Sequence, residues 1–271
     1  MITTVNEKGS LMLKHLVIAA GLVGAFASAA LARDIKVGSE CTYPPFNFRD
    51  AKGELQGFDI DVAREIGKRL NANLIFVCQQ WDGMIPALLA GKFDLLLASM
   101  SITEDRKKTI DFSVPYRSST ARFIGSKALK VSPVAADGKP NPAGLAGKTV
   151  GIQRSSTYEQ YMTKEFAGAK VAQYDTVDNM LLDLQSNRID LVFAGPIKLD
   201  GDFLQKPRGE KFTFIGPEIN DVSYFGPGVG VGIRKADSAL RDEVDAALTA
   251  SFKDGSFKAI NDRYWSFSVL P

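Results

Sequence analysis

The chain has 271 residues, of which 33 are Lys or Arg, 31 are Asp or Glu and 45% are hydrophobic. This length suits two lobes better than one, because single domains most often have about 100–150 residues. The formal net charge of +2 and the lack of a basic block give no support to a nucleic-acid or anionic-membrane partner.

The chain begins with the three-part pattern of a secretory signal peptide. A short basic stretch, Met12–His15, precedes an apolar run from Leu16 to Ala27, and Ala30–Ala32 forms a small-x-small cleavage signal. The apolar run is well short of the roughly 20 residues that a membrane span needs. We therefore expect residues 1–32 to be removed on export to the periplasm, leaving a mature chain that starts at Arg33.

Removal of this segment takes away the only histidine, His15, together with Lys8, Lys14 and Glu7. The mature chain then has 31 basic and 30 acidic residues. It also lacks the commonest metal ligand and the commonest general base at neutral pH. No metal, cofactor or catalytic residue is expected.

Cys41 and Cys78 are the only cysteines, and an exported protein can keep a disulfide. Each lies near the carboxyl end of a predicted strand, in neighbouring βαβ units, so pairing is geometrically feasible. The alternative is two separate buried thiols, because the sequence does not fix the Cα separation that a disulfide requires.

The mature chain alternates short apolar strands with amphipathic helices, which indicates an α/β sheet. The strands expected first are 34–38, 74–77 and 93–98, with helices at 59–70, 83–90 and after Thr103. A Pro/Gly-rich surface segment, 132–147, separates these from strands 148–152, 171–174 and 189–194 and helices 156–166 and 176–186. An extended crossover at 218–225, a strand at 228–234 and helices at 239–252 and 257–265 complete the chain.

Five residues of one helix-turn-strand unit recur 96 positions later. They are Met84, Leu88, Asp94, Leu95 and Ala98, matched by Met180, Leu184, Asp190, Leu191 and Ala194. The constant offset indicates two copies of one βαβ plan. Ligands bind outside the carboxyl ends of the strands in such sheets. Ser99 and Gly195, which follow the two equivalent strands, are therefore expected at the mouth of a shared cleft.

The expected fold is α/β with two lobes, each a mostly parallel sheet flanked by helices, joined by a two-strand hinge. The last piece of the chain is too small to be a domain and should return to the first lobe. Lobe 1 is therefore expected to comprise residues 33–117 and 226–271, and lobe 2 residues 118–225 including the hinge strands.

Short motifs occur in a specific order along the mature chain. They are Tyr43–Phe46, Gly57–Asp61, Trp81–Leu88, Phe93–Asp94, Met100–Arg106, Asp111–Ser113, Gly151–Thr157 and Gly228–Lys235. This order resembles the polar amino-acid solute-binding proteins (family 3 extracellular receptors), within the group of lysine/arginine/ornithine-binding and opine (octopine or nopaline)-binding proteins. The resemblance implies a monomeric periplasmic receptor that closes about its hinge on one solute and meets the membrane subunits of an ABC importer.

Arg106 lies in the first turn of a short predicted helix, and its guanidinium offers paired donors that fit a carboxylate. The resemblance implies that it binds the ligand's α-carboxylate beside Ser101; the alternative is a surface arginine. Ser156 and Thr157, which follow Gln153 in one motif, open a helix whose free N–H groups favour an anion. The resemblance implies that they hold the same carboxylate, and plain N-capping is the alternative.

Tyr43 and Trp81 follow the ends of the first two strands. Their aromatic faces could enclose a guanidinium or a methylene stem, although ordinary core packing is the alternative. Glu40 lies where cation-binding members of the family carry an acidic residue, so the resemblance implies pairing with a cationic side chain. A solvated surface acid is the alternative.

Gly195 departs from the family's pattern, in which amino-acid binders usually have an aspartate that accepts hydrogen bonds from the α-ammonium. Either another acid compensates or the ligand is not a free α-amino acid. Glu40, Trp81 and the Ala98–Ser101 turn resemble opine-binding receptors, whose N-substituted arginine ligands would need space near Gly195. Free arginine, lysine or ornithine and an arginine-derived opine therefore both remain candidates.

Two other functions compete with this interpretation. An enzyme on the same fold, resembling cyclohexadienyl or arogenate dehydratases, would turn over a cyclohexadienyl substrate. The sensor half of a signalling receptor would need a later membrane segment.

Overall fold

The computed structural model describes Met1 and residues 32–271. Arg33–Pro271 forms one compact unit and contains every helix and strand of the described residues. The predicted signal peptide, residues 1–32, lies outside the described residues apart from its two end residues. No helix within 32–271 is both long and apolar enough to cross a membrane.

The first sheet has five strands in the order β5-β1-β6-β13-β7. They are β1 (Arg33–Ser39), β5 (Ala72–Cys78), β6 (Leu95–Leu96), β7 (Asp111–Phe112) and β13 (Gly232–Ile233). β1 is parallel to β5 and β6, whereas β13 is antiparallel to β6 and β7. The chain therefore leaves this sheet after β7 and returns to it near the end.

The second sheet repeats this arrangement in the order β10-β9-β11-β8-β12. Its strands are β8 (Ala121–Ser126), β9 (Thr149–Gln153), β10 (Lys170–Tyr174), β11 (Leu191–Ala194) and β12 (Phe212–Ile219). β9 is parallel to β10 and β11, whereas β8 is antiparallel to β11 and β12. In each sheet, three parallel strands are thus followed by one strand that runs against them.

The antiparallel strands refine the predicted fold. The predicted α/β class with two lobes, each with a mostly parallel sheet, is confirmed, and one strand in each sheet, β13 or β8, is antiparallel to both of its neighbours. β8 and β13 are the first strands after the chain crosses from one sheet to the other. The chain enters each sheet beside the carboxyl ends of the parallel strands, so the entering strand runs in the opposite direction. The strands of the first sheet lie within the residues predicted for lobe 1, and those of the second sheet lie within the residues predicted for lobe 2. The exact lobe boundaries stay predictions.

The repeat of 96 residues corresponds to the same hydrogen bonds in both sheets. Asp94 accepts a 3.0 Å hydrogen bond from the backbone N–H of Lys36, and its own N–H donates to the Lys36 carbonyl at 2.8 Å. Asp190 forms the same pair of bonds with Thr149, at 2.9 and 3.0 Å. Each aspartate therefore fastens the turn before a central strand to the first strand of its sheet.

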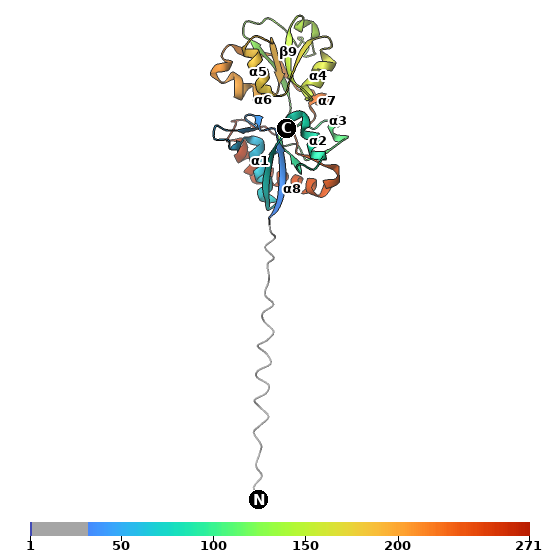
Figure 1. The fold of residues 1–271 in the computed structure, drawn as a ribbon, viewed down its shortest axis with the longest axis vertical. Helices are drawn as coiled ribbons and strands as arrows, with labels where there is room; N and C mark the ends of the chain where they lie inside the picture. Colours follow the sequence, from blue (N-terminus) through green and yellow to red (C-terminus); the bar gives the residue numbers. More distant parts are fainter. Residues whose placement is uncertain (2–31) are drawn as a thin grey trace. The chain divides into compact units, whose positions relative to one another are not determined.

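Helices flank both sheets (Figure 1): α4, α5 and α6 lie around the sheet that contains β9, and α1, α2 and α8 lie around the other. The helices are α1 (Phe58–Arg69), α2 (Met84–Leu89), α3 (Glu104–Lys107), α4 (Thr157–Glu165), α5 (Val177–Gln185), α6 (Pro196–Leu199), α7 (Val222–Phe225), α8 (Ser238–Asp254) and α9 (Ser256–Asn261). Ser156 and Thr176 cap α4 and α5 with their hydroxyls. α8 ends at Gly255 in the left-handed conformation, as its sequence predicts.

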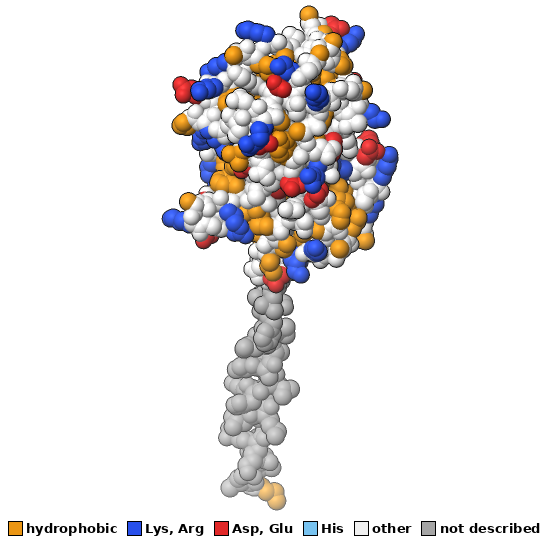
Figure 2. All heavy atoms as spheres, turned by 45° about the horizontal axis from the view of Figure 1, so that its top comes forward, with side chains coloured by type: hydrophobic (Ala, Val, Ile, Leu, Met, Phe, Trp, Pro, Cys, Tyr) orange, Lys and Arg blue, Asp and Glu red, His pale blue; other side chains and the backbone are white. Residues whose placement is uncertain are grey.

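Shorter elements complete the unit. They are a small sheet of β2 (Thr42–Tyr43), β3 (Asn47–Arg49) and β4 (Leu55–Gln56), the 3₁₀ turns η1 (Trp81–Gly83), η2 (Pro142–Leu145), η4 (Pro207–Gly209) and η5 (Lys235–Asp237), and the π-helical turn η3 (Asp200–Leu204). The segment 132–147 is not wholly at the surface, because Val134 and Leu145 are buried in a core cluster with β8 and β9. Basic, acidic and hydrophobic side chains are interspersed on the face that Figure 2 shows.

Two crossings connect the sheets and lie side by side. Arg117 in the first crossing bridges to Val229 in the second, and Ala121 pairs with Ile219. At Gly226 (φ 66°), an added Cβ would lie 1.6 Å from the carbonyl oxygen of Ile102. The second crossing therefore passes so close to the first lobe that only glycine fits there.

The prediction of an extended crossover over 218–225 is wrong for its second half, where α7 forms. The carboxylate of Asp221 accepts hydrogen bonds from the N–H and the hydroxyl of Ser223, at 2.9 and 2.5 Å, and so starts the helical turn. The rings of Tyr224 and Phe225 then pack against Tyr161 of α4, with centroids 5.0 and 5.6 Å apart.

The helix predicted over 257–265 ends earlier, at Asn261. The Asn261 side chain donates to the Phe267 carbonyl at 2.8 Å and accepts from the N–H of Val269 at 3.0 Å. These bonds hold the following segment against the helix end. Trp265 lies beyond the helix and packs edge-on against Phe58, 4.9 Å between ring centroids.

Candidate functional site

A narrow cavity of about 20 Å³ lies between the two sheets, next to the carboxyl ends of β1, β6 and β9. Its lining residues come from both sheets and are Glu40, Tyr43, Trp81, Ala98, Ser99, Ser101, Arg106, Gln153, Ser156, Thr157 and Tyr158. Ten of the eleven ligand-binding residues predicted from the sequence are in this set. Gly195 is not among them and lines a larger hollow next to the cavity.

Arg106 brings a buried positive charge to the cavity, with 8% of the residue exposed. Thr103 caps α3 by accepting from the N–H of Arg106, and Nη1 of Arg106 donates to the Ser101 carbonyl at 2.9 Å. No carboxylate in residues 32–271 forms an ion pair with this guanidinium. Burial lowers the pKa of Arg106 to about 10, so it stays charged at neutral pH. A buried cation without a partner favours the arrival of an anion.

Glu40 brings the opposite charge and is 6% exposed. Its Oε1 accepts hydrogen bonds from Nε2 of Gln153 at 2.9 Å and from Oγ1 of Thr42 at 3.4 Å. Burial raises the pKa of Glu40 to about 7, although Gln153 and the charge of Lys198 act in the other direction. No Lys or Arg of the described chain forms an ion pair with it. Glu40 is therefore a buried acid that a cation would stabilise in its ionised form.

Trp81 and Tyr43, two aromatic residues of the cavity, each lie near a cation of the protein. The guanidinium of Arg106 lies 5.4 Å from the ring centroid of Trp81, and Nζ of Lys198 lies 5.3 Å from that of Tyr43. Nε1 of Trp81 is buried and has no hydrogen-bond partner, so it is a donor that a ligand could use. That the two rings enclose a ligand stays a prediction.

The start of α4 supplies the opposite wall. Gln153 ends β9, and its carbonyl accepts a 2.5 Å hydrogen bond from the hydroxyl of Ser156. The same hydroxyl accepts from the N–H of Glu159 at 3.2 Å, so Ser156 is an N-cap. Thr157 is the first residue of the helix. The capped helix start and Arg106 thus line one cavity from opposite sheets, which concentrates positive potential there.

A buried carboxylate that the sequence analysis did not select holds two of the site loops. Asp59, at the start of α1, is fully buried. Its Oδ2 accepts from Nδ2 of Asn47 at 2.9 Å and from the hydroxyl of Ser99 at 2.8 Å, and its Oδ1 accepts from Tyr116 at 2.9 Å. Asn47 in turn accepts from the N–H of Cys41 at 3.0 Å.

The hydrogen bonds around Asp59 restrain the backbone of two residues at the cavity. Ser99 (φ 54°) and Cys41 (φ 63°) both adopt the left-handed conformation, which costs free energy for residues other than glycine. Ser99 donates its hydroxyl hydrogen bond to Asp59, and Cys41 donates its N–H hydrogen bond to Asn47, and these bonds hold both residues in that conformation. The acid in the first turn after Gly57 is a signal in the sequence that could have pointed to a tethering role.

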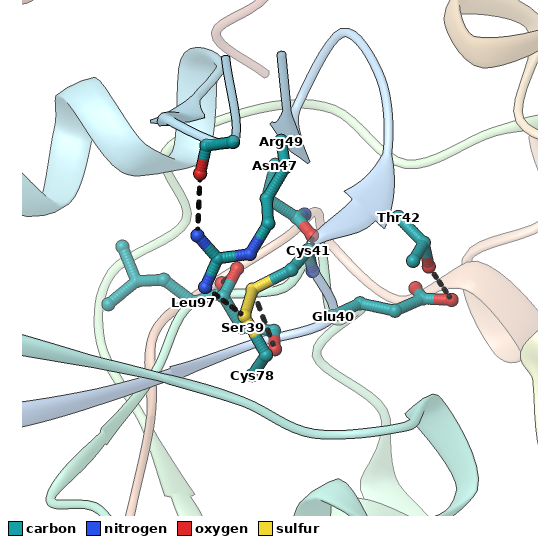
Figure 3. The surroundings of a disulfide bond; sticks show 9 residues. Ser39, Glu40, Cys41, Thr42, Asn47, Arg49, Cys78 and Leu97 are labelled. Atoms are coloured by element: carbon teal, nitrogen blue, oxygen red, sulfur yellow. Dashed lines mark hydrogen bonds between the residues drawn. A yellow bond between two sulfur atoms is a disulfide. The ribbon is translucent and has the colours of Figure 1, made fainter. Parts of the chain in front are cut away.

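Cys41 and Cys78 form a disulfide with 5.6 Å between their Cα atoms (Figure 3). The bond ties the loop after β1 to the end of β5. Glu40, Cys41 and Thr42 are consecutive in that loop, and Thr42 hydrogen-bonds to Glu40. The disulfide therefore restrains the loop that carries the cavity's carboxylate.

Tyr158 is a cavity residue that sequence reasoning missed. A Cβ at Gly195 would lie 2.9 Å from the hydroxyl of Tyr158 and 3.6 Å from that of Tyr43. The two hydroxyls both lie beside Gly195, and burial raises the pKa of Tyr158. The Tyr158 hydroxyl therefore occupies space that a side chain at position 195 would need. Tyr158 directly follows Thr157, but its direction depends on the packing of α4.

The described residues contain no group of three or more His, Cys, Asp or Glu side chains that could hold a metal ion. The cavity brings together a buried arginine, a buried acid, a helix start and aromatic rings. Such a set is suited to holding a small molecule that has both an anionic and a cationic group.

Comparison with known proteins places the chain in a family. The sequence profile of bacterial extracellular solute-binding proteins, family 3, matches residues 35–267. The chain is 35% identical over 257 residues to the L-arginine-binding protein of Pseudomonas aeruginosa, covering 92% of this chain and 96% of that protein. It is also 35% identical over 266 residues to the lysine/arginine/ornithine-binding periplasmic protein of Escherichia coli, covering 97% of this chain and 98% of that one.

A solved structure supports the same assignment. A periplasmic binding protein from Salmonella typhimurium with high arginine specificity has a TM-score of 0.78 and 29% sequence identity, over 87% of this chain and 100% of that chain. All three of these proteins are binding proteins. The chain belongs to the bacterial extracellular solute-binding proteins of family 3.

Proposed function

We propose that this protein is the periplasmic receptor of an ABC importer and binds a cationic amino acid or an arginine-derived opine by closing its lobes. One observation carries the proposal. Arg106 and Glu40 line the same cavity with buried, opposite charges, and neither has an ion-pair partner among the described residues. A solute with a carboxylate and a cationic group would compensate both charges at once.

The carboxylate of the ligand is assigned to Arg106. Its guanidinium has one side-chain hydrogen bond, to the Ser101 carbonyl, so it keeps donors for a second partner. Thr157 and the N-terminus of α4 add backbone donors from the other sheet. A carboxylate held from both sheets would favour the closed arrangement over an open one.

The cationic end of the ligand is assigned to Glu40. A guanidinium or ammonium there would pair with the carboxylate and lie near the rings of Tyr43 and Trp81. The names of the relatives, which bind arginine or lysine, arginine and ornithine, agree with such a charge. Gly195 provides no carboxylate for an α-ammonium, which keeps an N-substituted ligand as a candidate beside the free amino acids.

Binding by closure follows from the size of the cavity. A volume of about 20 Å³ holds about one water molecule, so an amino acid would enter while the lobes are further apart. The bond between Gln153 and Glu40 joins the sheets across the cavity. A ligand shifts the protein toward closure only by the difference between its affinities for the closed and open forms. Small-angle scattering should show a smaller radius of gyration with ligand, and an unchanged radius would contradict closure.

The proposed site of action and partner are those that the names of the relatives suggest. The proposed leader would export the protein, and N-terminal sequencing of the exported form should find Arg33 first. The closed lobes of a monomer would then present a surface to the importer's membrane subunits. The proposal contains no catalytic step, and consumption of a cyclohexadienyl substrate would favour the alternative of a dehydratase.

Isothermal titration calorimetry tests the ligand assignment directly. Arginine, lysine, ornithine, octopine and nopaline should include at least one tight ligand, whereas glutamine and glutamate should bind weakly. Arg106→Gln and Glu40→Gln should each weaken the tight ligand by about a hundredfold, as expected for losing one partner of a buried charge pair. Arg188→Gln, at an exposed ion pair with Asp183, is the matched control. Tight and selective binding of an uncharged or acidic amino acid would overturn the proposal.

A further inference from the structure

A second, larger hollow adjoins the narrow cavity. It has a volume of about 640 Å³ and is lined by the segment 43–46, the first crossing, strands β8 and β12, helices α4 and α6, and the segment 264–268 near the end of the chain. Tyr43 and Tyr158 line the hollow as well as the cavity, and Gly195 lines the hollow beside their hydroxyls. The pair of tyrosines therefore forms the partition between the two spaces. The hollow is named here the hinge-side hollow.

Arg117 is the buried charged group of this hollow that lacks an ionic partner. It is 8% exposed, its guanidinium lies 4.2 Å from the ring centroid of Phe46, and its Nη1 donates to the Ser118 carbonyl at 2.9 Å. Its Nε is buried without a hydrogen-bond partner. Among residues 32–271, no carboxylate forms an ion pair with it. Buried guanidinium groups in proteins are normally paired.

The other basic residues of the hollow differ in how far they are compensated. Lys198 forms ion pairs with Asp178 at 3.0 Å and Asp202 at 2.8 Å. Arg122 stacks 4.2 Å from the ring centroid of Phe214 and donates to the Gly216 carbonyl at 3.1 Å, without an ion pair in the described chain. The carboxylates of Asp200 and Glu218 also line the hollow, but neither forms an ion pair with Arg117 or Arg122 in the part of the chain that the structure describes.

Tyr158 links this charge to the cavity. Both Arg106, in the cavity, and Arg117, in the hollow, act electrostatically on its hydroxyl. Arg106 lines the cavity together with Tyr43 and Tyr158, so a ligand whose carboxylate is on Arg106 would have its α-carbon near the tyrosine partition. Gly195 has no side chain, and the atoms nearest to the position of its absent Cβ belong to Tyr158 and Tyr43, led by their hydroxyls at 2.9 and 3.6 Å.

We propose that the hinge-side hollow is a second subsite, in which Arg117 binds a carboxylate borne by a substituent on the ligand's α-nitrogen. The preferred ligand class is then a cationic amino acid with a carboxyalkyl group on that nitrogen. Such a ligand would place one carboxylate on Arg106, its cationic end on Glu40 and its second carboxylate on Arg117. The α-nitrogen would hydrogen-bond to the tyrosine hydroxyls. This inference rests on the proposed function, because it takes the first carboxylate to be on Arg106.

Three ligands of graded chemistry test the subsite on the unmodified protein. They are L-arginine, octopine, which is Nα-(1-carboxyethyl)-L-arginine and is called the carboxyethyl compound below, and Nα-isopropyl-L-arginine. In the last of these a methyl group replaces the second carboxylate. Calorimetry should find the carboxyethyl compound at least about tenfold tighter than the isopropyl compound, because a charge-assisted hydrogen bond is lost in the latter. Equal affinities for these two compounds would overturn the subsite.

Variants separate a binding role of Arg117 from a structural one. Arg117→Gln should weaken the carboxyethyl compound by about tenfold or more and change the affinity for L-arginine by less than about twofold. Arg122→Gln is the matched control and should have the smaller effect. Equal losses for both ligands in Arg117→Gln would show that the arginine supports the fold and would overturn the proposal.

A second variant covers the case in which Arg117→Gln does not fold. Gly195→Ala would place a methyl group 2.9 Å from the Tyr158 hydroxyl and should weaken the carboxyethyl compound more than L-arginine. If L-arginine binds tightly and the carboxyethyl compound does not bind, the subsite is overturned and the proposed function stands. If no cationic ligand binds, both are overturned.

Discussion

Gln153 donates a 2.9 Å hydrogen bond to the carboxylate of Glu40 and so joins the end of β9 in one sheet to the loop after β1 in the other. Because the amide is neutral, this bond leaves the charge of Glu40 uncompensated. A cationic ligand would supply the compensating charge. One carboxylate can therefore take part in both closure and recognition.

The affinity for arginine is expected to fall by up to about tenfold per pH unit below pH 7. Burial raises the pKa of Glu40 to about 7 in the free protein, and a paired cation would lower that pKa in the complex. Binding then releases a proton at acidic pH and weakens as the pH falls. Calorimetry in buffers of different ionisation enthalpy measures the affinity and the proton together. Glu40→Gln should show a flat profile, and an equally steep one would assign the effect to another group.

Glu40→Gln should also stabilise the ligand-free protein at pH 8. An acid whose pKa is higher in the folded state than its ordinary value of 4.5 costs stability as the pH rises from about 4.5 to about 7. A difference of this size corresponds to about 3 kcal/mol, so we expect a gain of roughly 2–3 kcal/mol at pH 8 and almost none at pH 4.5. Urea unfolding at both pH values measures the difference.

Glu104→Gln is the control for this stability measurement, because Glu104 is in an exposed ion pair with Lys107. It should change the stability little at either pH. If Glu40→Gln destabilised the protein equally at both pH values, its hydrogen bonds rather than its buried charge would dominate.

The position of the cavity could be predicted because it depends on strand order. Glu40, Ser99 and Gln153 each end or follow a parallel strand, and those ends meet at one edge of a sheet. Hydrophobic periodicity also placed α1 to within one residue at either end. Both signals are local in sequence and need no knowledge of how the sheets pack together.

The rest depends on contacts between distant segments. Asp59 acts on Asn47, Ser99 and Tyr116, and only the folded chain brings these groups together. Tyr158 reaches the cavity because α4 packs against β11 and α7 through Phe193 and Phe225. The helical turn α7 replaced an extended crossover for the same reason, since its aromatic rings find partners on α4. Tertiary packing overrides local preference at such places.

The disulfide should stabilise the fold through the loop that it closes. Cys41 and Cys78 are 37 residues apart, and closing a loop of that length restricts the unfolded chain by about 3–4 kcal/mol. The double variant Cys41→Ser, Cys78→Ser should lose about that free energy of unfolding and bind ligand more weakly, because Glu40 adjoins Cys41. Unfolding with and without a reductant is the control. Identical midpoints would show that the cysteines are unpaired.

Gly226→Ala should destabilise the second crossing. Its Cβ would lie 1.6 Å from the Ile102 carbonyl oxygen, and a backbone atom cannot move aside without shifting the segment that carries it. We expect a loss of about 2–4 kcal/mol in chemical denaturation. Gly53→Ala is the matched control, because Gly53 also has a positive φ (81°) but nothing lies within 4 Å of its Cβ. Equal losses would attribute the whole effect to backbone conformation.

Asp59→Ala should both destabilise the protein and loosen the cavity. Removing the carboxylate leaves the buried donors of Asn47, Ser99 and Tyr116 without their acceptor. Each lost bond costs about 1–3 kcal/mol, so we expect a total loss of roughly 3–5 kcal/mol, with partial relaxation. Asp59→Asn keeps one acceptor oxygen, so its free energy of unfolding should lie between those of Asp59→Ala and the unmodified protein.

Ligand affinity distinguishes a positioning role of Asp59 from a purely structural one. Ser99 and the N–H of Cys41 are fixed through Asp59 and Asn47, so the loops that carry the cavity residues should become mobile in the variants. At a temperature where each variant is still fully folded, Asp59→Asn should bind arginine more weakly, while the exposed control Asp105→Asn, from an ion pair with Lys108, should not. Unchanged affinity in a folded Asp59→Asn protein would limit the network to stability and leave the left-handed conformations of Cys41 and Ser99 to be held by the disulfide and the backbone alone.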